Sequence, residues 1–154
     1  MSTTQPIRSK QLLHDFKEYY LTKQPNSRNY TLILIGLNTA LRINDILHLT
    51  WGDVYCTEHS RFYTHLLITE KKTEKETRIL INRELQETLL SYRKTQTSIA
   101  DTDYLFPSPR KADSPLSRYQ AYRIVRKAAE AVGIEDVIRC HSLRKTFGYH
   151  AWKM

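Results

Sequence analysis

The chain has few residues that break regular structure: four glycines and five prolines in 154 residues. An all-β fold places such residues in its many turns, so the sequence favours helices joined by few connections. Hydrophobic residues make up 40% of the chain, which is enough for the core of one domain of this length. We therefore predict a single, mainly helical domain over residues 1–154.

Six stretches have the spacing of apolar residues that is typical of helices. They cover residues 8–23, 28–40, 44–49, 83–96 and 117–132, and a last one begins near His141. Pro25 separates the first from the second, and Ser27 is the expected capping residue of the second. The second stretch is apolar on nearly all sides, which predicts a buried helix. Ser117 is expected to cap the fifth helix, and Gly133 to end it.

The middle of the chain has the composition of a β-hairpin. Residues 62–69 and 77–82 are rich in β-branched and aromatic side chains, and the charged residues 70–76 lie between them. This pattern predicts two antiparallel strands joined by a polar tip. The expected fold class is therefore α+β, mainly α with a small antiparallel β-sheet.

The charge of the chain indicates the kind of partner. Lys and Arg number 24 against 16 Asp and Glu, a formal net charge of +8, which favours a polyanionic partner, most often nucleic acid. The two cysteines, Cys56 and Cys140, match no metal-binding or disulfide pattern. The longest apolar run, residues 32–37, is too short to cross a bilayer. We expect a reduced, cytoplasmic protein that needs no metal or other cofactor.

The first feature with chemical potential is an arginine at the junction of two predicted helices. Arg42 follows the buried helix, where an unpaired charge is costly, and Asp45 lies three residues later. Side chains at this spacing on a helix can meet, so the carboxylate can orient the guanidinium. The alternative is an ordinary pair of surface helices.

The second feature is the lysine-rich hairpin tip. Lys71, Lys72 and Lys75 lie in it, and Arg78 follows in the second strand. Three glutamates nearly balance this charge, so the tip is not a simple cationic patch. A lysine on a hairpin can enter a DNA groove and give a proton to a leaving oxygen. The alternative is a solvated tip, since hairpin tips are usually polar.

The third feature is a histidine and an arginine at the start of the last predicted helix. His141 and Arg144 are three residues apart, so they share one face of a helix. Together they offer two kinds of hydrogen-bond donor to one phosphate. Taken alone, a His-x-x-Arg pair is more often structural.

In the order Arg42, hairpin lysine, His141-x-x-Arg144, the sequence resembles the tyrosine recombinases of the phage integrase family. Residues 40–47 resemble the first-arginine box of that family, and residues 51–54 resemble the segment that follows this box. Residues 72–81 resemble the β-hairpin of the family, and residues 141–147 resemble its second-arginine box. The resemblance runs from about residue 28 to the end. It implies the catalytic-domain fold of tyrosine recombinases.

The resemblance also implies a reaction, site-specific recombination or integration of DNA through a 3′-phosphotyrosine, without metal or ATP. Arg42 and Arg144 would neutralise the phosphate in the transition state. His141 would donate a further hydrogen bond or accept the tyrosine proton. Lys72 would protonate the departing 5′-oxygen, and the other lysines of the tip are rivals for that role.

The implied partner is double-stranded DNA at specific recombination sites. Lys71, Lys75, Arg78 and Lys145 are the expected DNA contacts, and Asp45 supports the first arginine. Family members act as homo-oligomers on DNA, and the resemblance implies a protein encoded by a bacterium or a phage.

The sequence departs from the family pattern in one respect that concerns catalysis. Members place the nucleophilic tyrosine well beyond the second arginine, and here Met154 comes ten residues after Arg144. Tyr149 is rotated by about 140° from Arg144 on a helix, so we expect it to pack rather than attack. We expect a C-terminally truncated catalytic domain, inactive as it stands, with no core-binding domain ahead of it.

Two alternatives belong to other functional classes. A non-catalytic remnant of a recombinase would still bind the phosphates of DNA but would form no covalent bond with DNA. A basic helical interaction domain without a role on nucleic acid requires all three boxes to be coincidental. Type IB topoisomerases share this kind of active site, but the box sequences resemble those of integrases more closely.

Overall fold

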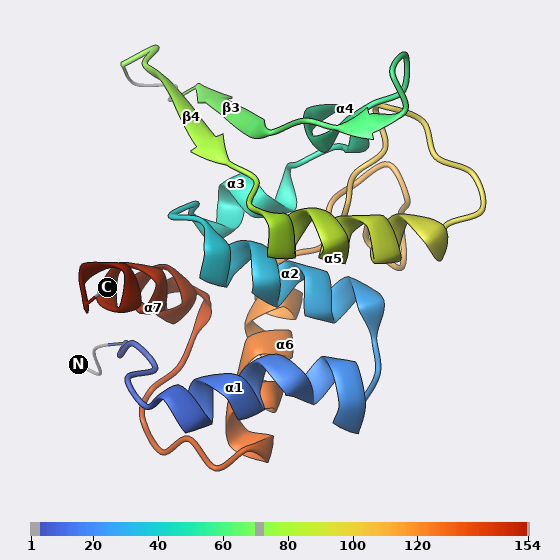
Figure 1. Cartoon of the computed structure of the whole chain (residues 1–154). Coiled ribbons are helices and arrows are strands. Elements are labelled where there is room, and N and C mark those ends of the chain that lie inside the picture. Colours follow the sequence, from blue (N-terminus) through green and yellow to red (C-terminus); the bar gives the residue numbers. More distant parts are fainter. Residues whose placement is uncertain (1–3, 70–72, 154) are drawn as a thin grey trace.

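Helix α2 (Ser27–Asn38) forms the centre of the fold in the computed structural model, which describes residues 4–69 and 73–153. Its side chains from Leu32 to Ile35 are almost completely buried, as expected for a helix that is apolar on nearly all sides. Other helices pack around α2 in Figure 1: α1 (Lys10–Glu18), α3 (Ile43–Leu47), α5 (Arg83–Lys94), α6 (Arg118–Ala131) and α7 (Cys140–Lys153).

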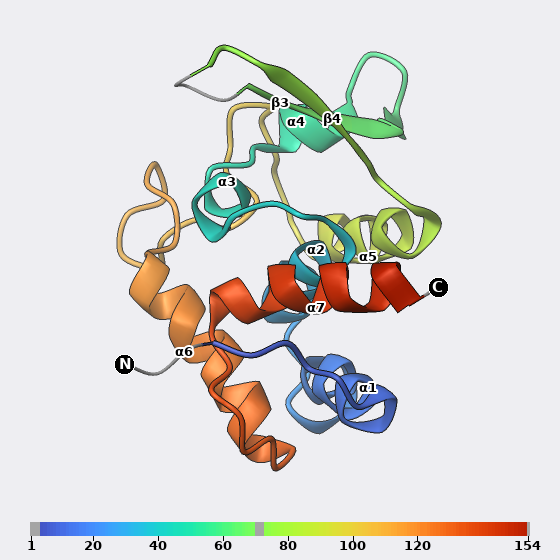
Figure 2. The same cartoon turned by 90° about the vertical axis from the view of Figure 1, so that its left-hand side faces the viewer.

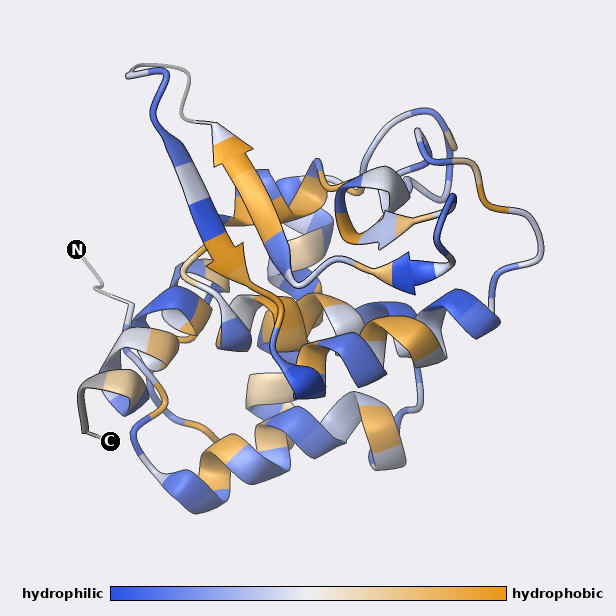
Figure 3. Cartoon of the chain, turned by 45° about the horizontal axis from the view of Figure 1, so that its top comes forward, coloured by the Kyte–Doolittle hydropathy of each residue, from blue (hydrophilic) through white to orange (hydrophobic). Residues whose placement is uncertain are grey.

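Two small antiparallel sheets complete the fold. Strands β3 (His65–Thr69) and β4 (Glu76–Leu80) form the expected hairpin, in a register that pairs Leu66 with Ile79. Figure 3 shows that β3 is largely apolar and that the hairpin projects from the helical body. A second ladder joins β1 (Tyr55–Cys56) to β2 (Arg61–Phe62). The prediction of a mainly α fold with a small antiparallel sheet is confirmed, with one more ladder than expected.

The first predicted helix starts later than expected and ends at Lys23 as expected, but its last turn is not α-helical. Helix α1 begins at Lys10 because the Ser9 hydroxyl accepts a hydrogen bond from the Leu12 amide. Its C-terminal continuation is a π-helical turn, η1 (Tyr19–Lys23). Both tyrosines of η1 are buried, so the wider turn directs two large rings into the core.

The capping residue assigned to the second helix was wrong. Asn26, rather than Ser27, is the N-cap of α2, because its side-chain oxygen accepts from the Asn29 amide at 3.0 Å. Ser27 is the first residue of the helix. Asn and Ser cap helices about equally well, so composition alone did not distinguish them.

The other boundaries differ by a few residues. The third helix starts at Ile43 and ends at Leu47, and a short helix that the sequence analysis missed, α4 (Trp51–Val54), follows it. Phe62, placed in the hairpin by its composition, belongs to β2 and packs its ring against Tyr55. The predicted end of the basic helix is confirmed: Ser117 caps α6 in a capping box, and Gly133 has a φ of 81°.

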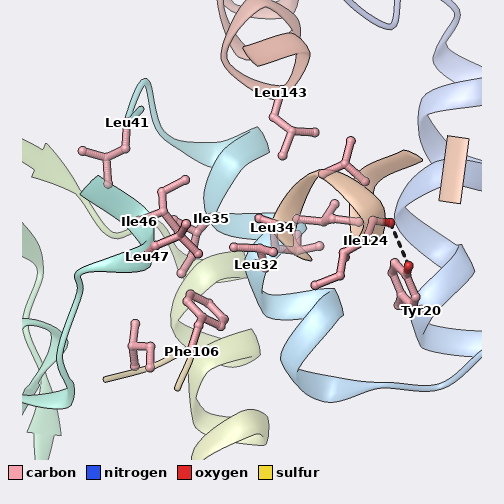
Figure 4. Close-up of a cluster of buried hydrophobic side chains, with 14 of the residues drawn as sticks. Tyr20, Leu32, Leu34, Ile35, Leu41, Ile46, Leu47, Phe106, Ile124 and Leu143 are labelled. Carbon is pink, nitrogen blue, oxygen red and sulfur yellow. Dashed lines mark hydrogen bonds between the residues drawn. The ribbon is translucent and has the colours of Figure 1, made fainter. Parts of the chain in front are cut away.

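The core lies between α2 and the elements that surround it. Figure 4 shows Leu32, Leu34 and Ile35 of α2 among side chains from α3, α6 and α7. The Tyr20 hydroxyl donates to the Ile124 carbonyl at 2.7 Å, which joins η1 to α6. Among the described residues, no helix combines the length and apolarity that crossing a membrane requires.

Candidate functional site

Arg42 lies at the N-cap of α3 with an exposed side chain. The segment that leads to it is fixed by buried neighbours. The Thr39 hydroxyl donates to the Ile35 carbonyl at 2.8 Å and accepts from the Leu41 amide at 3.3 Å. Leu41 and Ile46 are buried on either side of Arg42, so the backbone holds the arginine at a defined place on the surface.

Asp45 lies in the first turn of α3, as predicted, and is half-buried. Its amide donates to the Arg42 carbonyl at 3.0 Å. Within the described ranges the ion pairs join Lys17 to Glu84, Arg83 to Glu87 and Arg126 to Glu130. None of them contains Asp45, so a carboxylate that orients Arg42 remains a prediction.

Helix α7 carries His141 and Arg144 in its first turns. His141 is exposed and Arg144 is half-buried, whereas Ser142 and Leu143, which lie between them, are buried. The Ser142 hydroxyl accepts from the Arg139 amide at 3.0 Å, which fixes the entry into the helix. The polar pair is therefore directed away from the core by buried residues on the opposite side of the helix.

Helix α2, which precedes Arg42, and helix α7, which carries Arg144, approach each other closely at Gly36 and Leu143. A Cβ atom placed on Gly36 of α2 would lie 2.5 Å from Leu143 Cδ1 and 3.0 Å from Leu143 Cβ. Such distances are too short for two carbon atoms in van der Waals contact, so glycine is what lets α7 approach α2 at this point. Figure 2 shows α7 passing below the segment that leads from α2 to α3, and Figure 4 shows Leu143 directed towards the core.

The hairpin residues are placed only in part. Lys71 and Lys72 lie outside the described residues. Lys75 is exposed near the tip, where its amide donates to the Thr73 hydroxyl at 3.3 Å, and Arg78 is exposed on β4 opposite Leu67. The hairpin therefore presents cations on its surface, as a DNA contact requires.

Lys145 has a different environment from the other predicted DNA contacts. Its ammonium donates to the Thr4 carbonyl at 2.8 Å and is half-buried. It thus lies towards the N-terminal segment, and its role in DNA binding remains a prediction.

Tyr149 also faces the N-terminal segment. Its ring lies 5.1 Å from that of His150 and 6.0 Å from the Arg8 guanidinium, measured between centroids and from centroid to Cζ. It is half-buried, which agrees with the expectation that it packs.

Metal-ligand clusters are absent from the part of the chain that the structure describes. Cys140, at the first position of α7, is half-buried, and burial raises the pKa of its thiol to about 11. This thiol is therefore protonated at neutral pH and is a poor ligand or nucleophile.

Two residues that place the site, Gly36 and Thr146, were not among those predicted from the sequence. Gly36 interrupts an otherwise apolar run, and a glycine inside a helix is a signal of close approach. Thr146 is almost fully buried and accepts a hydrogen bond from Ile7, 139 residues away. No local pattern points to a contact over that separation.

Comparison with protein families gives a match over almost the whole chain. The sequence model described as the phage integrase family matches residues 5–153. The probable integrase/recombinase YoeC of Bacillus subtilis is 44% identical over 153 residues, which are 99% of this chain and 77% of YoeC. The type 1 fimbriae regulatory protein FimE of Escherichia coli is 33% identical over 80% of this chain and 60% of FimE.

Solved structures show the same fold. XerA recombinase superposes with a TM-score of 0.76 and 21% identity over 98% of this chain, and lambda integrase bound to DNA with a TM-score of 0.68 and 16% identity over 96%. This chain spans 52% and 51% of those two chains, respectively. The fold is that of a tyrosine recombinase catalytic domain.

Proposed function

The chain belongs to the phage integrase family, and on this basis we propose that it contributes the phosphate-binding part of a DNA recombination site. The observation that carries the proposal is the contact of Gly36 with Leu143. It brings the segment of Arg42 and the helix of His141 and Arg144 to the same end of α2. This proximity of the two segments supports the proposal that Arg42, His141 and Arg144 contact one phosphate.

Two arginines on one phosphate explain the chemistry without a metal ion. Phosphodiester cleavage develops negative charge on the non-bridging oxygens, and a planar guanidinium can donate two hydrogen bonds to them. We assign this role to Arg42 and Arg144. His141 supplies a further donor or accepts the proton of the attacking hydroxyl.

A leaving 5′-oxygen needs a proton, and we assign its donor to Lys72, which the sequence places in the hairpin tip. Lys71 and Lys75 are the alternatives. Arg78 would contact the DNA backbone from β4, where it is exposed. Asp45 would orient Arg42 once DNA is bound.

The attacking group of the family is a tyrosine, and we do not assign that role to Tyr149, the tyrosine that follows Arg144. Tyr149 is turned towards Arg8 and His150. We propose that this chain by itself binds duplex DNA without cleaving it, as a non-catalytic remnant also would. Assembly into an oligomer on DNA and residence in the cytoplasm are part of the same proposal.

The proposal is tested by binding and by covalent capture. Fluorescence anisotropy with a labelled DNA duplex should give an affinity that falls steeply with salt, because each neutralised phosphate contributes a slope of about −0.9 in log K against log salt. Nicked duplexes should give no complex that survives denaturation. A salt-independent affinity contradicts DNA as the partner, and a stable covalent complex contradicts the absence of a nucleophile.

Charge-matched variants separate site contacts from general attraction. Arg42→Gln and Arg144→Gln should each reduce the salt slope by about 1, the effect of one lost phosphate contact. Arg61→Gln is the control, since Arg61 is an exposed arginine of β2 that lies beside Arg93 and Lys94. Equal effects of all three variants would contradict a specific site.

A further inference from the structure

The residues ahead of α1 form an extended segment along α7, the helix of His141 and Arg144. We call residues 4–8 the N-terminal strap. Figures 1 and 2 both show it beside α7. Ile7 of the strap is 2% exposed, so the segment is packed against the helix rather than lying loosely on the surface.

Four polar contacts attach the strap. The Ile7 amide donates to the Thr146 hydroxyl at 2.9 Å, and His150 Nε2 lies 2.9 Å from the Ile7 carbonyl. The Lys145 ammonium donates to the Thr4 carbonyl. The Gln5 amide donates to the Val137 carbonyl at 3.0 Å, just before α7 begins.

Thr146 is the centre of this attachment. Its hydroxyl donates to the Ser142 carbonyl at 2.7 Å and accepts from Ile7. One buried group thus connects the strap to the turn that contains Arg144. Removing the hydroxyl would leave the buried Ile7 amide without its acceptor, which is costly.

We propose that the N-terminal strap and Thr146 position α7, so that Arg144 reaches the phosphate. The strap holds α7 at Thr146. The absence of a side chain on Gly36 lets α7 pack against α2 at Leu143. Thr146 is a positioning residue, since it is buried and touches no DNA itself. This inference rests on the proposed function, because it concerns the phosphate contact of Arg144.

The assignment also accounts for Lys145. A lysine beside the second arginine looks like a DNA contact in the sequence, but its ammonium is bonded to the strap. We infer that Lys145 acts through the same attachment as Thr146.

The test uses the whole chain and a labelled DNA duplex. Thr146→Val removes the hydroxyl without changing charge, and Thr146→Ser keeps it. With Thr146→Val the slope of log K against log salt should decrease towards that of Arg144→Gln, whose slope is smaller by about 1 than that of the wild type. A change in salt slope caused by an uncharged, buried substitution is what a merely structural role would not produce.

Rescue and coupling complete the test. Thr146→Ser should restore the wild-type slope. Adding Thr146→Val to Arg144→Gln should change the slope no further, because the contact is already lost. The matched control is Thr31→Val: Thr31 is equally buried and donates to the Ser27 carbonyl at 2.7 Å, four residues back in α2.

The outcomes are distinct. If Arg144→Gln lowers the slope of log K against log salt but Thr146→Val leaves it at the wild-type value, the positioning role of Thr146 is overturned and the proposed function stands. A wild-type slope for Arg144→Gln overturns the proposed function and the inference with it. If Thr146→Val does not fold, amide hydrogen exchange is measured on the wild-type protein instead. Slow exchange of the Ile7 amide supports the attachment of the strap to α7, and rapid exchange of this amide overturns it.

Discussion

Leu143 lies so close to Gly36 that a methyl group on the glycine would come within 2.5 Å of Leu143 Cδ1. The pair connects the central helix α2 to α7, and the residue after Leu143 is Arg144. The position of the second arginine thus depends on the absence of a side chain on α2.

Gly36→Ala should therefore destabilise the protein. Alanine favours a helix by about 1 kcal/mol over glycine, but inserting a methyl group into a packed contact costs about 1–3 kcal/mol. We expect a net loss of up to about 2 kcal/mol in the free energy of unfolding, measured by urea denaturation, together with weaker DNA binding.

Gly148→Ala is the matched control for that variant. Gly148 lies in α7, and apart from its chain neighbours and the backbone of its own helix, no described heavy atom lies within 4 Å of where its Cβ would be. This variant should gain about 0.5–1 kcal/mol from helix propensity. If both variants stabilise the protein equally, the Gly36–Leu143 contact does not restrict the approach of α7.

The protein should lose stability in strong alkali. Burial raises the pKa of Tyr20 and of Tyr92 to about 12, and their hydroxyls donate to the carbonyls of Ile124 and Leu105. Both are raised above the ordinary value of 10.0, so their contribution is complete below pH 10 and is lost as pH rises towards 12.

Tyr20→Phe separates the two tyrosines. The variant should be less stable at pH 8 by about 1 kcal/mol, since it lacks the hydrogen bond, and should lose less stability than the wild type between pH 10 and 12. Urea denaturation followed by circular dichroism at several pH values measures both effects. An identical alkaline response in the two proteins would show that Tyr20 is not buried in solution.

The two cysteines should differ in reactivity. Only the thiolate reacts rapidly with iodoacetamide, and burial raises the pKa of Cys140 to about 11. We expect Cys56 to be alkylated well before Cys140 at pH 8, as followed by mass spectrometry of the intact protein and its peptides. Equal rates would mean that the start of α7 opens readily.

The sequence predicted the elements whose signals are local. The basic helix was found because Ser117 and Gly133 flank its two ends in the sequence. The hairpin was found because the β-branched stretches and the charged tip are contiguous. The order of Arg42, the hairpin lysines and His141 gave the family, which the comparisons confirm.

Features that depend on distant contacts were not predicted. The ladder of Tyr55 with Phe62 has only two residues in each strand, too few for an alternating pattern. The attachment of the strap depends on the hydrogen bond between Ile7 and Thr146, which are 139 residues apart, so no local sequence pattern indicates it. Gly36 could be recognised as unusual, but only the packing of α7 shows which residue needs the space.

A double-mutant cycle on DNA affinity measures whether Arg42 and Arg144 bind one phosphate. Arg42→Gln, Arg144→Gln and the double variant are compared with the wild type in the same salt. Residues that share a ligand group are coupled by about 0.5–3 kcal/mol, whereas distant, independent sites are additive within about 0.5 kcal/mol. We predict coupling in this range, with the double variant little weaker than either single one. Additive losses would contradict a shared phosphate.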